Sequence, residues 1–429
     1  MNLTKRICAQ LLSAGICLGL SAGLQAQTGT GALIFGTPGA GLRYQPALLH
    51  AAGAYGIWTS GMYAAALQPV PLGELLSLEG VLETADKDRL MGYLGGENRL
   101  HIGQGWSAGG WGRIGRVPLS LDFSRMQLTS LRFGAPHTLG LVLYGNARYA
   151  GQTLEDAEMH LLRQAWNEIA AGTAGAADSG RLAWGLRAKV LIGTQADSWE
   201  SVSYSLLTAA DGRQIDLRGA YTRFRLPEGQ GGTGAGIDAG LHWNPDGPWQ
   251  AGISATDLGF IRWRGTVYDN EVDLSYAGFD AAELFADGFP DGEELSDTLR
   301  MLLYPDSMAG GYRTVLPGLV QAQIGYELGE RAAVQAGIIQ GLGRYSATGA
   351  RPVVWAAYVR QLGPVQLAAH AGAGGIDGLR LGLAGQGNIR IGAYGLTWFA
   401  SADQVLGGVL PGRGRGLAVQ GGIAFAAGK

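Results

Sequence analysis

Cysteine is almost absent from this chain. Its 429 residues include only Cys8 and Cys17, and both lie within the first 26 positions. There Lys5 and Arg6 precede an apolar run, and small residues end the segment near Ala26. This layout is typical of a secretory signal peptide, so we expect residues 1–26 to be removed. The chain that follows would have no thiol, which excludes disulfides and cysteine metal sites from it.

Charge and long apolar runs are also scarce. Charged residues make up 16% of the chain and the formal net charge is −3, whereas about 25% is usual. Nothing resembles a basic stripe, so we expect no nucleic-acid partner. Beyond residue 26, no stretch approaches the roughly 18 apolar residues that a membrane-spanning helix needs. We therefore expect export from the cytoplasm without a helical anchor.

Patterns that indicate chemistry are missing as well. The six histidines, at positions 50, 101, 137, 160, 242 and 370, show no metal-site spacing. Residues 229–234 match G-x-G-x-x-G, but they open into a strand pattern instead of a helix, which favours a glycine turn over a dinucleotide site. No nucleophile and base lie near each other in sequence. We therefore predict a protein that is not an enzyme and that has no cofactor or metal.

What the chain does contain is glycine and period-two alternation. It has 73 glycines, more than twice the usual share of about 7%, and they are interleaved with Val, Leu, Tyr and Trp. From 316 to 429 the pattern reads strand, turn, strand; in residues 320–328, for example, five apolar side chains alternate with polar ones or glycine. A sheet this long must pair, cover or close its edges, and a barrel closes them.

Charged residues alternate with apolar ones in two further strand patterns. Arg187 and Lys189 oppose the apolar row of residues 184–192, and Arg218 alternates with Ile215 and Leu217. The alternation fits a soluble barrel with an apolar interior or a membrane barrel with an apolar exterior. The signal peptide, the lack of cysteine and the roughly 14 to 18 strand-length segments of about ten residues favour the membrane version. We predict an all-β, transmembrane antiparallel β-barrel in the cell outer membrane, in contact with its lipid.

Several segments interrupt the strand pattern. Residues 27–49 have no sustained period and form a candidate lumen plug, and residues 50–429 form the barrel. Helical insertions are expected near 84–94, 153–171 and 279–305; the last is strongly acidic but lacks the spacing of a calcium loop. In 153–171, Thr153 would cap a helix that aligns Leu162, Trp166 and Ile169. Residues 139–143 alternate like a strand.

Two blocks carry a family resemblance. Residues 236–264 contain GIDAGLHW and AGISATDLGFIRWRG, and residues 312–328 read YRTVLPGLVQAQIGYEL, directly after the acidic insertion. This arrangement resembles the FadL-like outer-membrane barrels, closest to an uncharacterised-domain branch related to PorV and to the PorP/SprF proteins of gliding and type IX secretion. Gln45 stands where FadL-type barrels tend to have Asn before Pro-Ala. The resemblance implies a barrel of about 14 strands.

The resemblance also implies a function. The first hypothesis is a transporter or channel for small, hydrophobic molecules; the alternative is a barrel that docks a secreted or surface protein. A soluble secreted β-protein is a third reading of the composition. Ligand or plug contacts are expected at Asp257, Arg262 and Trp263, with Arg187, Lys189 and Arg218 as polar lumen residues. The competing interpretation places Trp263 in an interfacial aromatic girdle and treats the charges as packing.

Overall fold

The computed structural model describes residues 43–427 except 53, 72–73, 75–81, 97, 135–136, 212–213, 277–306, 344–350, 377 and 406–413. The described chain is a closed antiparallel sheet in which β1 pairs with both β2 and β16. The strands are β1 (Tyr55–Gln68), β2 (Asn98–Ile114), β3 (Val117–Phe133), β4 (Thr153–Ala177), β5 (Leu182–Thr208), β6 (Ile215–Arg225), β7 (Gly232–Trp243), β8 (Trp249–Tyr276), β9 (Ser307–Val315), β10 (Leu319–Gly329), β11 (Ala332–Gly341), β12 (Val353–Leu362), β13 (Val365–Gly374), β14 (Gly378–Ile391), β15 (Tyr394–Ala402) and β16 (Gly416–Ala427).

The 16 strands occupy 14 positions around the barrel because two positions are each shared by two strands. β6 and β7 both lie between β5 and β8, β6 along one half of these long strands and β7 along the other. In the same way, β9 and β10 pair with successive halves of the other edge of β8. The prediction of a transmembrane barrel of about 14 strands is therefore confirmed.

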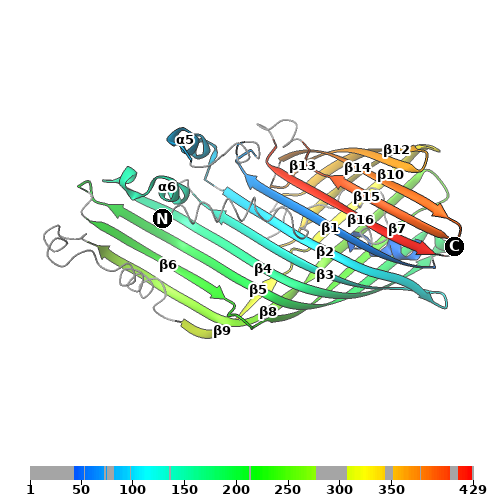
Figure 1. Cartoon of the computed structure of the whole chain (residues 1–429), viewed down its shortest axis with the longest axis horizontal. Coiled ribbons are helices and arrows are strands. Elements are labelled where there is room, and N and C mark those ends of the chain that lie inside the picture. The colour runs from blue at the N-terminus through cyan, green and yellow to red at the C-terminus, as the bar shows by residue number, and fades with distance from the viewer. Residues whose placement is uncertain are drawn as a thin grey trace.

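The two ends of the barrel differ. Six connections at one end have two to five residues, whereas the other end carries most of the longer ones, such as 69–97 and 277–306. In outer-membrane barrels the short turns lie on the periplasmic side and the long loops outside. β4, β5 and β8, of 25, 27 and 28 residues, extend together with β6 past most of the other strands at the long-connection end (Figure 1).

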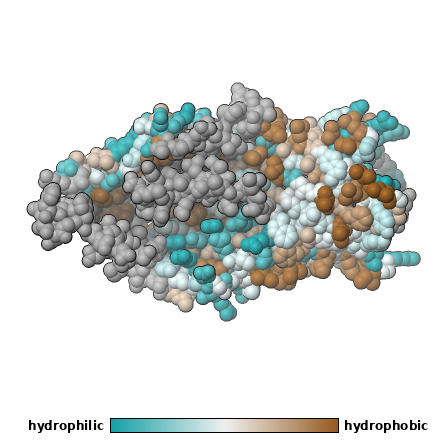
Figure 2. Space-filling model, viewed as in Figure 1, coloured by the Kyte–Doolittle hydropathy of each residue, from teal (hydrophilic) through white to brown (hydrophobic). Residues whose placement is uncertain are grey.

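The apolar row of most strands points outward. Leu121, Val190 and Leu383 expose 62%, 58% and 57% of their surface, while Asp122 and Lys189, on the opposite face, are buried. Figure 2 shows hydrophobic residues concentrated toward the short-turn end and hydrophilic residues more frequent along the other half. A closed barrel leaves no unpaired edge within the hydrocarbon and presents its apolar band to lipid. This outward orientation confirms the outer-membrane prediction and excludes the soluble barrel.

The region predicted as the clearest helix is a strand. Residues 153–171 belong to β4, and its even-numbered residues from Leu162 to Ala170 are buried on the inner face. Glu, Gln, Ala and Leu favour helices in isolation, but pairing with β3 and β5 along almost the whole strand outweighs that preference.

Conversely, the strand predicted at 139–143 is part of a helix, α6 (His137–Tyr144). A second helix, α5 (Thr84–Tyr93), lies where the sequence indicates one, and a capping box between Glu83 and Asp86 begins it. No helix among the described residues is long and apolar enough to cross a membrane. The acidic insertion at 279–305 lies outside the described residues.

Candidate functional site

A short N-terminal segment lies against the inner wall of the barrel. It comprises residues 43–51, which include the 3-10 helix η1 (Pro46–Ala51). The side-chain amide of Gln45 donates hydrogen bonds to the carbonyl oxygens of Leu241 at 3.1 Å and Ile253 at 3.3 Å. The carbonyl oxygen of Tyr44 accepts one from the Ser254 hydroxyl at 2.6 Å. Backbone carbonyls of β7 and β8, together with the Ser254 hydroxyl, thus hold the segment in a defined position.

Glycines in the wall permit this close contact. A Cβ at Gly185 of β5 would overlap the backbone of Pro46, and one at Gly240 of β7 would overlap the Gln45 side chain. The Gly185 position cannot be relieved by rotating a side chain, because the obstruction is backbone. The wall at Gly185 therefore accommodates the segment only as glycine.

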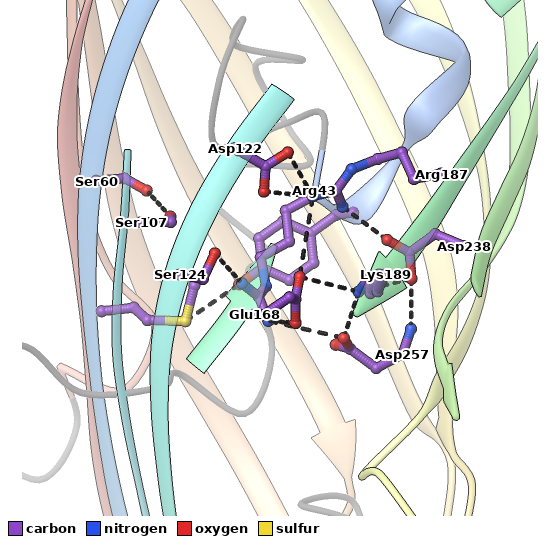
Figure 3. A network of polar contacts seen from close by, with 12 residues as sticks. Arg43, Ser60, Ser107, Asp122, Ser124, Glu168, Arg187, Lys189, Asp238 and Asp257 are labelled. Atoms are coloured by element: carbon purple, nitrogen blue, oxygen red, sulfur yellow. Dashed lines mark hydrogen bonds and ion pairs between the residues drawn. The ribbon is translucent and has the colours of Figure 1, made fainter. Parts of the chain in front are cut away.

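Beside the segment lies a set of buried charges that we call the lumenal ion cluster (Figure 3). Five strands and the N-terminal segment contribute to it: Arg43 from the segment, Asp122 from β3, Glu168 from β4, Arg187 and Lys189 from β5, Asp238 from β7 and Asp257 from β8. All seven residues are less than 9% exposed.

Arg187 bridges opposite sides of the cluster. Its Nη2 lies 2.7 and 2.8 Å from the two carboxylate oxygens of Asp122, and its Nη1 lies 2.6 Å from Oδ2 of Asp238. A guanidinium suits this position because its rigid fork can serve two carboxylates at once.

Lys189 binds the remaining carboxylates. Its Nζ lies 2.5 Å from Oδ1 of Asp257, 2.8 Å from Oδ1 of Asp238 and 3.4 Å from Oε1 of Glu168. The backbone N–H of Asp257 also donates to Oδ1 of Asp238 at 2.7 Å. The two aspartates are thereby fixed relative to each other and to Lys189.

Arg43 connects the N-terminal segment to the cluster through longer contacts. Its Nη2 is 3.7 Å from Glu168 and 3.7 Å from Asp257, and its Nη1 donates to the Ser124 hydroxyl at 3.2 Å. The attachment of the segment is therefore partly electrostatic and looser than the pairs within the wall.

The charge balance of the cluster is close but not neutral. Three cations face four carboxylates, which leaves a formal excess of one negative charge. Burying charges is costly, and removing one partner leaves the others uncompensated. Each cation of the cluster thus stabilises several carboxylates at once.

The cluster coincides with a change in strand pairing. Asp257 has a positive φ of 56°, and the register between β7 and β8 shifts between Ile237 and Ala239. On the other edge of β8, pairing with β10 ends at Thr256 and pairing with β9 starts at Phe260. This irregularity directs both Asp238 and Asp257 toward the interior.

Apolar side chains also point inward. One cluster, the β3–β8 apolar cluster, includes Met126, Trp166, Leu191, Ile261 and Trp263, all 1% exposed or less. A second, the β10–β16 apolar cluster, includes Ile339, Val353, Trp355 and Phe399 and also Tyr44 of the N-terminal segment. The interior is therefore amphiphilic, unlike the polar interior of a water-filled porin.

The structure brings together half of the sequence-predicted site residues. Asp257, Arg187 and Lys189 meet in the lumenal ion cluster. Arg262 points outward, and Arg218 pairs with Asp273 at 3.1 Å on an exposed surface.

Trp263 faces the interior and donates from its Nε1 to the Thr314 hydroxyl at 2.8 Å. The interpretation of Trp263 as an interfacial girdle residue is therefore wrong. Its ring lies against Gly193 and Gly232, where a Cβ would overlap it.

Sequence reasoning missed Arg43, Glu168 and Asp238 as site residues. Asp238 alternates with Ile237 and Ala239, so the period-two pattern of β7 could have identified it. Glu168 was missed because residues 153–171 were predicted to be a helix, so no strand face was assigned to it. Arg43 lies in an aperiodic segment that gives no sequence signal.

A family model covers most of the chain. The model of the family of unknown function DUF5723 matches residues 46–386. The chain belongs to this family. No curated protein matches the chain.

Solved structures of similar shape include a hydrocarbon channel, a toluene transporter and a FadL homologue. The deltaS2S3 mutant of the TodX monoaromatic hydrocarbon channel is 11% identical, with a TM-score of 0.48, and the match covers 92% of this chain and 95% of that one. The Ralstonia pickettii toluene transporter TbuX is 11% identical, with a TM-score of 0.46 and coverage of 90% and 93%. A Pseudomonas aeruginosa FadL homologue is 11% identical, with a TM-score of 0.45 and coverage of 90% and 92%. At this identity, the likenesses identify neither a substrate nor a partner for this DUF5723 member.

Proposed function

We propose that this protein is an outer-membrane transporter or channel for small hydrophobic molecules, with the N-terminal segment 43–51 as its lumen plug. The observation that carries this proposal is the presence of two apolar clusters on the inner face of a membrane barrel. A lumen that passes only water and ions has no need of inward-facing tryptophan, leucine and isoleucine. Apolar inner surfaces, in contrast, can lower the free energy of an apolar solute inside the barrel.

In this proposal the lumenal ion cluster holds the plug. Arg43 reaches Glu168 and Asp257 only at 3.7 Å, whereas Arg187 and Lys189 of the wall pair with the three aspartates of the cluster at 2.5 to 2.8 Å. Movement of the segment would break the weaker contacts and leave the pairs within the wall intact. Asp257 would then be a plug contact, in keeping with its prediction from sequence.

The proposal can be tested by displacing the segment without altering a charge. Gly185→Val places a side chain where the Pro46 backbone lies, and Gly112→Val is the matched control because a Cβ there meets nothing within 4 Å. Cells that produce wild-type protein should take up radiolabelled toluene or oleate faster than cells with the empty vector. Gly185→Val should raise both uptake and single-channel conductance, and Gly112→Val should match the wild type. If wild-type uptake equals that of the vector and Gly185→Val changes nothing, transport is refuted.

A second candidate function is the docking of a secreted or surface protein, as in the PorV and SprF resemblance. It is supported by the extension of β4, β5, β6 and β8 beyond most of the barrel at the long-connection end (Figure 1). In that case uptake should equal that of the empty vector in both the wild type and Asp257→Ala. The substitution should instead weaken a stable complex between the barrel and its protein partner. Unchanged uptake and complex formation would return Asp257 to a packing role.

A further inference from the structure

A group of four exposed arginines lies on the outer face of the barrel. We call it the outer arginine patch and define it as Arg225 of β6, Arg262 and Arg264 of β8 and Arg313 of β9, all exposed. In the sheet register Arg262 is directly opposite Arg313, Arg264 is opposite Gly311 and Arg225 is opposite Thr266. Because Thr266 shares a face with Arg264, the four side chains form one continuous surface.

Like charges directly opposite each other destabilise an antiparallel pair. Among the described residues, no carboxylate pairs with Arg262, Arg264 or Arg313. Arg225 is opposite Asp197 of β5 in the sheet register, but that carboxylate pairs with Arg223 at 3.1 Å. Arg262 and Arg313 instead lie over the Phe260 ring, with their guanidinium carbons 5.4 and 4.1 Å from its centroid. The Phe260 ring offsets part of the repulsion between the two cations, and an anion bound between or above them would offset the rest.

The position of the patch indicates where that anion comes from. Phe260 is the register partner of Val315, and the next pair on the same outward face is Arg262 and Arg313. Val315 is 57% exposed, and farther toward the short-turn end Ile253 and Ile237 are 50% and 47% exposed. The outer surface thus changes from apolar to cationic within one pair of residues. Such a step marks the level at which acyl chains give way to headgroups.

The patch also lies well below the loops. Arg313 is six residues from the start of β9, and Arg262 is 14 residues from the end of β8. On the side of the barrel with the long connections, this level corresponds to the outer leaflet of the membrane.

We propose that the outer arginine patch binds the phosphate groups of a phosphorylated glycolipid in the outer leaflet. Phosphate is the anion that a fork of guanidinium donors binds in a bidentate manner. The apolar surface beside the patch would contact the acyl chains of the same lipid. This assignment does not depend on whether the barrel transports a solute.

The test compares lipid A carrying two phosphates with lipid A from which both have been removed. Each would be titrated against purified barrel in detergent, and bound lipid would be measured by native mass spectrometry. The double variant R262A/R313A should bind the phosphorylated lipid roughly 30-fold more weakly than the wild type, on the scale of ionic attraction to anionic lipid. Dephosphorylated lipid A should bind both proteins weakly and equally.

The matched control is R360A/R390A, which removes two exposed arginines near the short-turn end. It should bind phosphorylated lipid A like the wild type, and all three proteins should keep the mobility shift on boiling that shows a folded barrel. Equal affinity of the wild type and R262A/R313A for phosphorylated lipid A would refute the assignment. The assignment would also be refuted if R262A/R313A lost binding of polyglutamate but bound lipid like the wild type. That result would identify the patch as a protein-binding surface.

Discussion

At the scale of single residues, burial separates the charged side chains of this barrel into two groups. Arg187 is 3% exposed and contacts Asp122, Asp238 and Glu168, whereas the Arg218 side chain is 74% exposed and pairs with Asp273. Sequence alternation placed both on a polar face but could not distinguish them. Burial depends on where β6 lies along β5, and alternation within one strand contains no such information.

Arg187→Ala should lower the stability of the barrel strongly, because it leaves buried carboxylates without their cation. The expected loss is about 3–5 kcal/mol. Urea unfolding in lipid vesicles would measure it. Arg218→Ala, the exposed control, should cost about 1 kcal/mol or less. Equal effects of the two substitutions would contradict the account of the lumenal ion cluster.

At the scale of elements, the sequence predicted most strands and misassigned two segments. β4 was mistaken for a helix because both of its faces are mixed, which removes the period-two signal. Leu162 and Trp166 lie on the inner face with Gln164 and Glu168, and the other face includes Arg163 and Asn167. α6 was mistaken for a strand because Leu139, Leu141 and Leu143 alternate by chance. Short apolar segments are ambiguous between the two structures. One tertiary contact of α6 comes from a helix that is distant in the sequence.

That contact joins α5 to α6 outside the membrane. The Asp88 carboxylate of α5 accepts hydrogen bonds from the Tyr144 hydroxyl at 2.5 Å and from Arg148 at 3.0 Å. The Arg148 guanidinium also lies over the Tyr144 ring, 3.8 Å from its centroid. Both hydrogen bonds lower the pKa of Asp88 below its ordinary value of 3.8, and the one from Tyr144 has the larger effect.

A lowered carboxylate pKa means that the contact is fully stabilising above the ordinary value and is lost as the pH falls through the folded value. The protection factors of the α5 amides, which correct for the intrinsic pH dependence of exchange, should therefore be constant near neutral pH and should fall in acid below about pH 4. Asp88→Asn should give faster exchange already at neutral pH. Asp246→Asn is the control, because Asp246 pairs with Arg181 in the short turns at the other end of the barrel and does not contact α5. Identical profiles for Asp88→Asn and the wild type would contradict this role of Asp88.

At the scale of the whole molecule, the sequence predicted the architecture correctly. The outward direction of the apolar rows follows from alternation once the barrel is known to lie in a membrane, and Leu121, Val190 and Leu383 confirm it. The meeting of Arg43 with Glu168 and Asp257 could not be predicted. It joins positions 125 and 214 residues apart in the chain and depends on how the N-terminal segment enters the barrel.

Val190→Arg tests the outward direction directly. A cation on the lipid-facing surface near the middle of the apolar band should cost about 2–4 kcal/mol in unfolding experiments in lipid vesicles. Val190→Ala removes bulk without adding charge and should cost much less, since Val190 is 58% exposed to the surroundings of the barrel. If arginine is tolerated as well as alanine, Val190 does not face lipid.

The two halves of β8 pair with different strands, and this has a consequence for how such a barrel can change over evolution. β8 pairs with β7 and β10 along one half and with β6 and β9 along the other, and the junctions at 226–231 and 316–318 separate the two halves. An insertion or deletion at a junction alters the strand register in only one half of the wall, because the strands of the other half keep their own hydrogen bonds to β8. The half formed by β6 and β9, at the long-connection end, can therefore lengthen, shorten or acquire new specificity while the half formed by β7 and β10 stays unchanged.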